Sequence, residues 1–158
     1  MKSIACNLLG SVSDAEDAVQ ETFLKVYRGA AAFRGGASFS TWMYRILLNT
    51  CYDSIRRRSR RREAPAAADP SSATLDPPGA REDSSLRLEL EDSVGRLPEK
   101  PRSVFLLHAV EGFTHREIGE ILGVAEGTSR MLLFEAKREL QRLLWKGRPR
   151  ERQGESRA

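Results

Sequence analysis

The sequence predicts an all-α protein: two small helical domains joined by a flexible linker, the second containing a helix-turn-helix. Three observations predict this class. Apolar residues recur at three- and four-residue spacing through most of the chain, no segment alternates as a strand does, and residues 63–85 are poor in large aliphatic side chains. The 158 residues allow one ordinary domain or two small ones.

The composition excludes several other classes of protein. No apolar run reaches the length of a membrane span, and no signal peptide opens the chain. The two cysteines, Cys6 and Cys51, are too few for a disulfide scaffold and lack the spacing of zinc ligands. Basic residues outnumber acidic ones by 26 to 22, a mild excess whose distribution matters more than its size. We therefore expect a small, soluble, cytoplasmic protein with two buried free thiols.

Residues 1–62 form the first predicted domain. A short apolar face at its start is followed by Ser13 and Glu16, which have the spacing of a capping box at a helix start. This second helix has inward positions at Ala15, Ala18, Val19, Thr22, Phe23 and Val26. The glycines after Arg34 break the chain. Ser40 or Thr41 then caps a helix to about residue 58, with inward positions at Met43, Ile46, Leu47, Thr50 and Cys51.

Residues 63–85 are the predicted linker. They hold four of the seven prolines, a surplus of acidic residues and one large aliphatic side chain, Leu75. Such a segment buries too little apolar surface to offset the entropy of ordering it. The basic residues 146–158 are predicted to form a disordered tail for the same reason.

Residues 86–145 form the second predicted domain. Its first helix has a face made of Leu86, Leu90, Val94 and Leu97 and ends at Pro98. Pro101 begins the next helix, whose inward positions are Val104, Leu107 and Val110. Thr114 caps a short helix that carries Ile118, Ile121 and Leu122. The last helix, from about 126 to 145, has an apolar side made of Leu133, Ala136, Leu140, Leu143 and Leu144.

The two helices around Gly123 carry the most specific functional signal. Glycine suits the left-handed turn between helices, Val124 is placed to tie that turn to the core, and Gly119 permits close helix approach. These are the parts of a helix-turn-helix, whose second helix reads DNA bases. A simple αα-hairpin without a ligand is the alternative. The glycine turn and the short polar residues at the helix tip favour DNA binding.

Each of the two charged segments of the first domain allows two interpretations, a binding surface or a solvated part of a helix. The arginine run 56–62 suits a polyanion, and the aromatic residues before it suit unstacked bases, although Phe39 and Trp42 are better explained as packing residues. A solvated helix end is the alternative. The acidic positions of helix 14–28 could dock a basic partner helix, yet the residue types alone favour a solvated face that complements the helix dipole.

Catalysis finds little support in the sequence. The two histidines, His108 and His115, have no partner at a catalytic or metal-binding spacing, and no glycine-rich phosphate loop is present. We expect no enzyme activity, no cofactor and no metal site.

Four segments resemble a known family. Residues 14–28 (DAEDAVQETFLKVYR) are similar to the core-polymerase-binding helix of extracytoplasmic-function (group IV) sigma factors, which belong to the sigma-70 family. Residues 39–49 (FSTWMYRILLN), continuing into 53–58 (DSIRRR), resemble the family's helix for the −10 promoter element. Residues 97–107 (LPEKPRSVFLL) and 113–128 (FTHREIGEILGVAEGT) resemble its −35-binding domain.

The resemblance implies a transcription initiation factor that directs core RNA polymerase to promoters and assists their melting. Contacts with core polymerase are implied for Asp14, Asp17, Gln20, Glu21 and Leu24, and the resemblance places Asp17, Gln20 and Glu21 on the coiled coil of the β′ subunit. The β subunit is a further implied partner. Contacts with the −10 element, including bases flipped into the loop at 34–38, are implied for Arg34, Ser38, Arg45, Asn49, Tyr52, Arg56 and Arg57. Contacts with the −35 element are implied for Arg116, Glu126, Gly127, Thr128, Ser129, Arg130 and Lys137. Promoter DNA and an anti-sigma factor are the other implied partners.

This chain departs from the family pattern in two places. Family members have another helix before Ile4, so we expect a shortened or mis-assigned start, with an exposed apolar face at Ile4, Leu8 and Leu9 if nothing replaces that helix. The recognition helix carries large apolar residues and an acid where small, polar or basic residues are usual. Two alternatives follow: a stand-alone helix-turn-helix regulator, and a polymerase-binding decoy or anti-sigma protein that does not initiate transcription.

Overall fold

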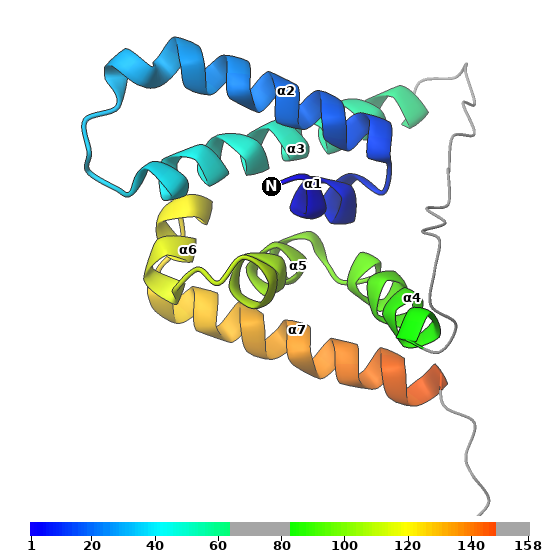
Figure 1. Cartoon of the computed structure of the whole chain (residues 1–158). Coiled ribbons are helices and arrows are strands. Elements are labelled where there is room, and N and C mark those ends of the chain that lie inside the picture. The colour runs from blue at the N-terminus through cyan, green and yellow to red at the C-terminus, as the bar shows by residue number, and fades with distance from the viewer. Residues whose placement is uncertain (64–82, 148–158) are drawn as a thin grey trace, which may run out of the picture.

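The computed structural model describes residues 1–63 and 83–147, which form helices joined by turns (Figure 1). No strand occurs within these two ranges, so the all-α prediction is confirmed. No helix in them is long and apolar enough to cross a membrane. Residues 63 and 83–85 of the predicted linker and residues 146–147 of the predicted tail are helical, and the rest of both segments lies outside the described residues.

The first domain contains α1 (Lys2–Leu9), α2 (Val12–Gly29), the 3₁₀ turn η1 (Ala30–Ala32) and α3 (Phe39–Glu63). Gly10 ends α1 in the left-handed conformation, at φ 67°. The Ser11 hydroxyl accepts a hydrogen bond from the Asp14 N–H at 3.3 Å, so Ser11 rather than the predicted Ser13 caps α2. Likewise, the Ser38 hydroxyl accepts from the Thr41 N–H at 3.1 Å, and α3 begins earlier than predicted.

The second domain contains α4 (Asp83–Gly95), α5 (Glu99–Phe105), the π-helical turn η2 (Leu106–Val110), α6 (His115–Leu122) and α7 (Glu126–Gly147). The π turn explains a wrong prediction. A π turn holds more residues than an α turn, so the inward face shifts along the sequence. Leu106 is therefore buried beside Leu107, while Val110, predicted to face inward, is 53% exposed.

Helix α1 lies between the two domains (Figure 1). It packs against α2 and α3 of the first domain and against α4 and α5 of the second. Ile4 and Leu8 are buried and Leu9 is half-buried, so the apolar face of α1 is not exposed. The second domain covers that face, and the buried residues of both domains form one continuous core cluster.

Three residues predicted to face the core lie on the surface instead: Phe23, Leu86 and Leu90 are 53%, 61% and 42% exposed.

The cysteine prediction holds for Cys51, which is buried, whereas Cys6 is half-buried. Burial raises the pKa of the Cys51 thiol to about 11. Because the thiolate is the reactive form, burial and the raised pKa both disfavour reaction of Cys51 at neutral pH.

Candidate nucleic-acid interface

The helix-turn-helix is built from α6, its turn and α7. Thr114 and Glu117 form a reciprocal capping box: the Thr114 hydroxyl accepts from the Glu117 N–H at 3.3 Å, and the Glu117 carboxylate accepts from the Thr114 N–H at 2.9 Å. That backbone hydrogen bond, with the one from the Thr114 hydroxyl, lowers the pKa of Glu117. Gly123 ends α6 with φ 67°, and the Val124 N–H donates to the Gly119 carbonyl at 3.0 Å. The predicted turn is confirmed.

Gly119 lets the turn approach α6 closely, and we expect its replacement by alanine to destabilise the second domain. A Cβ at Gly119 would lie 2.6 Å from the Val124 carbonyl oxygen, inside the contact distance of these atoms. The expected loss is about 1–3 kcal/mol, the usual cost of overpacking. Gly127→Ala is the matched control: a Cβ there meets nothing within 4 Å, so it should stabilise α7 by about 0.5–1 kcal/mol. Urea unfolding measures both variants, and equal midpoints would contradict this packing.

The residues predicted to contact the −35 element differ in accessibility. Arg116 of α6 is exposed, and so are Glu126, Gly127, Thr128, Arg130 and Lys137 of α7. Glu126 and Arg130 form an ion pair at 2.5 Å. Ser129 is fully buried, with its hydroxyl 3.0 Å from His115 Nδ1. The prediction that Ser129 faces DNA is therefore wrong, because its position turns it toward α6 and the core.

The outer face of α2 carries the residues predicted to bind polymerase. Asp17, Gln20 and Leu24 are exposed there. Sequence analysis missed two large neighbours on this helix, Phe23 and Tyr27, which are 53% and 84% exposed. The sequence pattern that could have placed Tyr27 on this face is its helical spacing from Gln20 and Leu24, because that spacing puts all three residues on one side of α2. The face thus combines acidic, amide and apolar groups.

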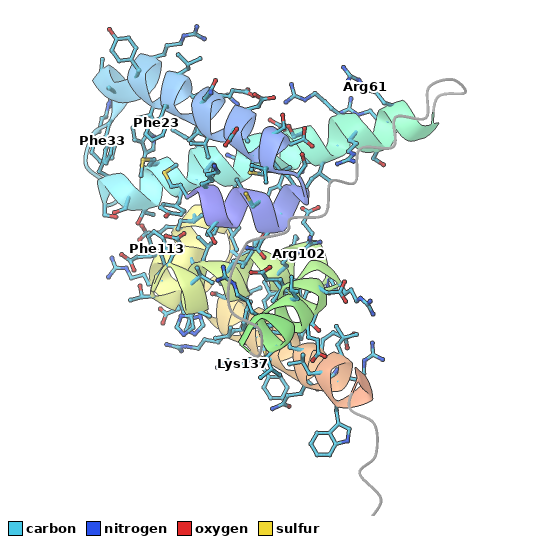
Figure 2. The ribbon with its side chains drawn as sticks, turned by 45° about the vertical axis from the view of Figure 1, so that its right-hand side comes forward. Phe23, Phe33, Arg61, Arg102, Phe113 and Lys137 are labelled. Atoms are coloured by element: carbon cyan, nitrogen blue, oxygen red, sulfur yellow. The ribbon has the colours of Figure 1, made fainter. Side chains whose placement is uncertain are left out.

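The two charged segments of the first domain contact each other. Arg58 of α3 lies 3.5 Å from Asp14 of α2, and Arg57 lies 3.8 Å from Glu21. Acidic residues that the resemblance assigns to polymerase therefore form ion pairs with arginines that it assigns to DNA. The rest of the run extends along α3 toward Arg61, near the end of that helix (Figure 2). These pairs are exposed, so each contributes little to stability.

The second domain covers part of the α3 surface predicted to bind the −10 element. The Arg45 guanidinium donates to the Glu120 carbonyl of α6, from Nε at 2.8 Å. The Tyr52 hydroxyl lies 2.6 Å from the Ser103 hydroxyl of α5. Arg45 and Tyr52, which were predicted to contact DNA, therefore contact the second domain in this arrangement. Asn49 is exposed.

Tyr44 of α3 is the centre of the contact between domains. Its ring meets that of Phe113 edge to face with centroids 4.9 Å apart, and its hydroxyl donates to the Glu111 carboxylate. Burial, together with the Glu111 carboxylate, raises the pKa of Tyr44. Sequence reasoning did not assign Tyr44 this role, because helical periodicity gives no information on pairing between domains.

Arg102 makes the contact between domains less favourable. Its Nη1 donates to the Asn7 carbonyl of α1 at 3.4 Å, while its buried Nε has no hydrogen-bond partner among the described residues. Burial lowers the pKa of this guanidinium, which means that its charged form is poorly solvated there. A buried, partly unsatisfied cation costs free energy.

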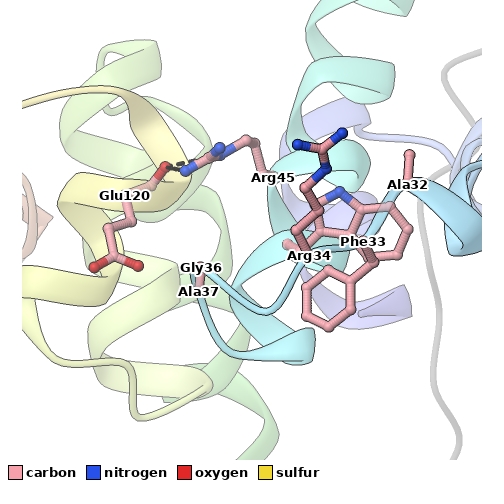
Figure 3. A pocket seen from close by; sticks show the side chains of 8 residues that line it. Ala32, Phe33, Arg34, Gly36, Ala37, Arg45 and Glu120 are labelled. Carbon is pink, nitrogen blue, oxygen red and sulfur yellow. Dashed lines mark hydrogen bonds between the residues drawn. The ribbon is translucent and has the colours of Figure 1, made fainter.

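A hollow of about 430 Å³ lies where the η1–α3 loop meets α6 (Figure 3). Its lining combines aromatic rings, two guanidinium groups and small residues: Ala32, Phe33, Arg34, Gly36, Ala37, Trp42, Arg45 and Glu120. Phe33, Phe39 and Trp42 pack together, with centroids 5.1 to 5.8 Å apart, as predicted for Phe39 and Trp42. Within the described ranges, no group of three or more His, Cys, Asp or Glu is placed to hold a metal ion.

Comparisons with known proteins agree with this geometry. Residues 1–61 match the family model of sigma-70 region 2, and residues 87–140 match that of sigma-70 region 4. The chain is 33% identical over 144 residues to the ECF RNA polymerase sigma-E factor of Haemophilus influenzae, covering 83% of this chain and 75% of that protein. The chain belongs to the ECF sigma factors.

Other ECF sigma factors are similarly related to this one. SigE of Mycolicibacterium smegmatis is 34% identical over 146 residues, which cover 90% of this chain and 56% of SigE. SigM of Mycobacterium tuberculosis H37Rv is 33% identical over 135 residues, covering 83% of this chain and 64% of SigM. This ECF sigma factor therefore spans between about half and three quarters of the length of these curated relatives.

Two solved structures share the fold of this ECF sigma factor. The sigma factor RpoE of Bartonella quintana, solved with the anti-sigma factor NepR, superposes with a TM-score of 0.79 at 26% identity, covering 93% of this chain and 91% of that one. CnrH, solved with the cytosolic domain of CnrY, superposes with a TM-score of 0.69 at 22% identity, covering 93% and 81%. The second likeness shows the fold alone.

Proposed function

We propose that this chain is a promoter-specificity subunit that binds core RNA polymerase, reads two promoter elements and assists DNA opening. The observation that carries the proposal is the placement of its surfaces. The outer face of α2 and the helix α7 lie on opposite sides of the molecule, and both are open to a partner (Figure 1). The α3 surface between them is partly covered.

Polymerase binding is proposed for the outer face of α2. Asp17 is exposed and has no ion-pair partner among the described residues, so its charge is available to a basic helix. Gln20, Leu24 and Tyr27 extend the surface with a hydrogen-bonding group and apolar area, the mixture that protein interfaces use. Asp14 and Glu21 would contribute after exchanging their α3 arginines for polymerase groups.

Recognition of the −10 element is proposed for α3 and the loop before it. On the side of the hollow that belongs to the first domain, Phe33 is proposed as a stacking surface and Arg34 as a cation for phosphate (Figure 3). An unstacked base that enters it is read at a cost of a few kcal/mol for leaving the stack. Because Arg45 and Tyr52 contact the second domain, the domains must separate before α3 can use its full surface.

Regulation by an anti-sigma factor is proposed from the neighbours. RpoE of Bartonella quintana was solved with the anti-sigma factor NepR. A protein that binds both domains of this chain would hold them in one arrangement and keep α3 from DNA. We propose no enzymatic step and no cofactor for this chain, and that it acts in the cytoplasm, where polymerase is.

Reconstitution with sigma-free bacterial core polymerase tests the function. The chain is expected to co-elute with core polymerase and to yield discrete transcripts from a library of genomic fragments. Polymerase binding without transcripts would instead support the decoy, and the loss of both would support a stand-alone DNA-binding protein. A core preparation with a known sigma factor controls for polymerase activity.

A further inference from the structure

The outward side of α7 is apolar at its centre. Gly127, Met131, Phe134 and Arg138 share this side, opposite the buried positions Ser129, Leu133, Ala136 and Leu140. Met131 is 59% exposed and Phe134 is 62% exposed. Two large apolar side chains therefore project from the recognition helix of a helix-turn-helix.

The polar groups near this side are poorly placed to read bases. Arg130 is paired with Glu126 at 2.5 Å, and Ser129 is buried. Gly127 has no side chain, which allows the helix backbone to approach a groove closely. Hydrogen bonding from α7 is thus limited around Met131 and Phe134, although these two occupy the middle of the surface that faces outward.

We propose that Met131 and Phe134 read the methyl groups of thymines in the −35 element. This inference rests on the proposed promoter-binding function. The thymine 5-methyl is the apolar feature of the major groove, and apolar side chains contact it in direct readout. Three helical residues span about 4.5 Å, close to the spacing of neighbouring base pairs of about 3.4 Å. The pair therefore fits adjacent base pairs.

The surroundings favour DNA over a protein partner. The start of α7, from Glu126 to Phe134, extends about 12 Å along the helix axis. Two exposed cations, Lys137 and Arg138, follow the apolar pair and suit phosphates, whereas Arg130 is paired with Glu126 and the exposed Glu135 lies beside Phe134 in sequence. The next large apolar residue on this side, Trp145, is about 17 Å farther along and lies outside this footprint.

Selection followed by thymine replacement tests the proposal. Polymerase core loaded with this chain selects from duplexes with a randomised upstream element, and we expect thymines at neighbouring positions. Deoxyuridine then replaces each selected thymidine, which removes only the methyl group. The expected loss of affinity is about fourfold per methyl group, the value for burying one CH₂. Filter binding at fixed salt measures it.

Variants separate a methyl contact from a general effect of deoxyuridine. Met131→Ala and Phe134→Ala should each lose the methyl dependence at one of the two thymine positions and keep it at the other, and the double variant should bind thymidine and deoxyuridine duplexes almost equally. Since both side chains are exposed, neither change should impair folding. Trp145→Ala removes an exposed aromatic residue outside the footprint and should keep the full methyl dependence.

Three results would overturn the inference. Selection without thymine preference, or equal affinity of the wild-type chain for both duplexes, would exclude methyl readout while leaving promoter binding intact. Unchanged DNA binding by the Met131→Ala, Phe134→Ala double variant would assign the apolar pair to a protein contact instead. Failure to select any upstream sequence would reject the proposed function as well.

Discussion

Reversing the charge of Asp17 is expected to abolish promoter-directed transcription. Asp17 is exposed at the centre of the outer face of α2, so Asp17→Lys leaves the core intact and changes only what a partner meets. Loss of one partner of a buried interfacial charge pair costs about 2–5 kcal/mol, and 2 kcal/mol is about a 30-fold loss of affinity. Titration of core polymerase with the variant measures this loss, and run-off transcription follows it.

The matched control carries the same charge change on another helix. Glu89→Lys alters an exposed position of α4, away from α2, and should retain polymerase binding. Binding of Asp17→Lys to upstream promoter duplexes should also persist, since α6 and α7 are unchanged. Full transcription with Asp17→Lys would show that polymerase does not bind this face of α2.

Replacing Tyr44 by alanine is expected to separate the two domains. The side chain is buried, packs on Phe113 and donates to Glu111, so it joins α3 to the second domain. Truncation of a buried aromatic residue costs about 3–5 kcal/mol. Small-angle scattering should show a larger radius of gyration, while circular dichroism should show retained helix.

Tyr44→Phe is the matched control for this prediction. It keeps the ring on Phe113 and loses the hydroxyl, at a cost of about 0.5–1.5 kcal/mol. The domains of this variant should stay together. An unchanged radius of gyration in Tyr44→Ala would mean that the remaining contacts, including those of α1, are sufficient to hold the closed arrangement.

Local signals in the sequence predicted the helix-turn-helix well. The spacing of Thr114 and Glu117, and a glycine at 123, act over a few residues, so the chain forms the cap and the turn wherever the segment folds. Local signals predict a helix start less well where two neighbouring polar residues could each serve as the N-cap. Ser11 and Ser13 are both acceptable caps, and the left-handed Gly10 decides between them by ending α1 just before Ser11.

The contact between domains could not be predicted from periodicity. Apolar spacing shows that Ile4 and Leu8 need cover, but not that α4 and α5 supply it. For the same reason, Arg45 and Tyr52 were assigned to DNA alone, while the structure pairs them with Glu120 and Ser103. The type of a side chain determines which groups it can bind. Which of them it contacts in this structure depends on how distant segments of the chain pack together.

A distance measurement between the domains tests the central claim, that the second domain and promoter DNA use the same surface of α3. Spin labels at Ser3→Cys and Gln141→Cys, both exposed positions, are introduced after Cys6 and Cys51 are replaced by alanine. Pulsed electron paramagnetic resonance should give one distance between the two labels in the free chain and a longer distance in a polymerase–promoter complex. An unchanged distance between the labels in a complex that makes transcripts would contradict the account.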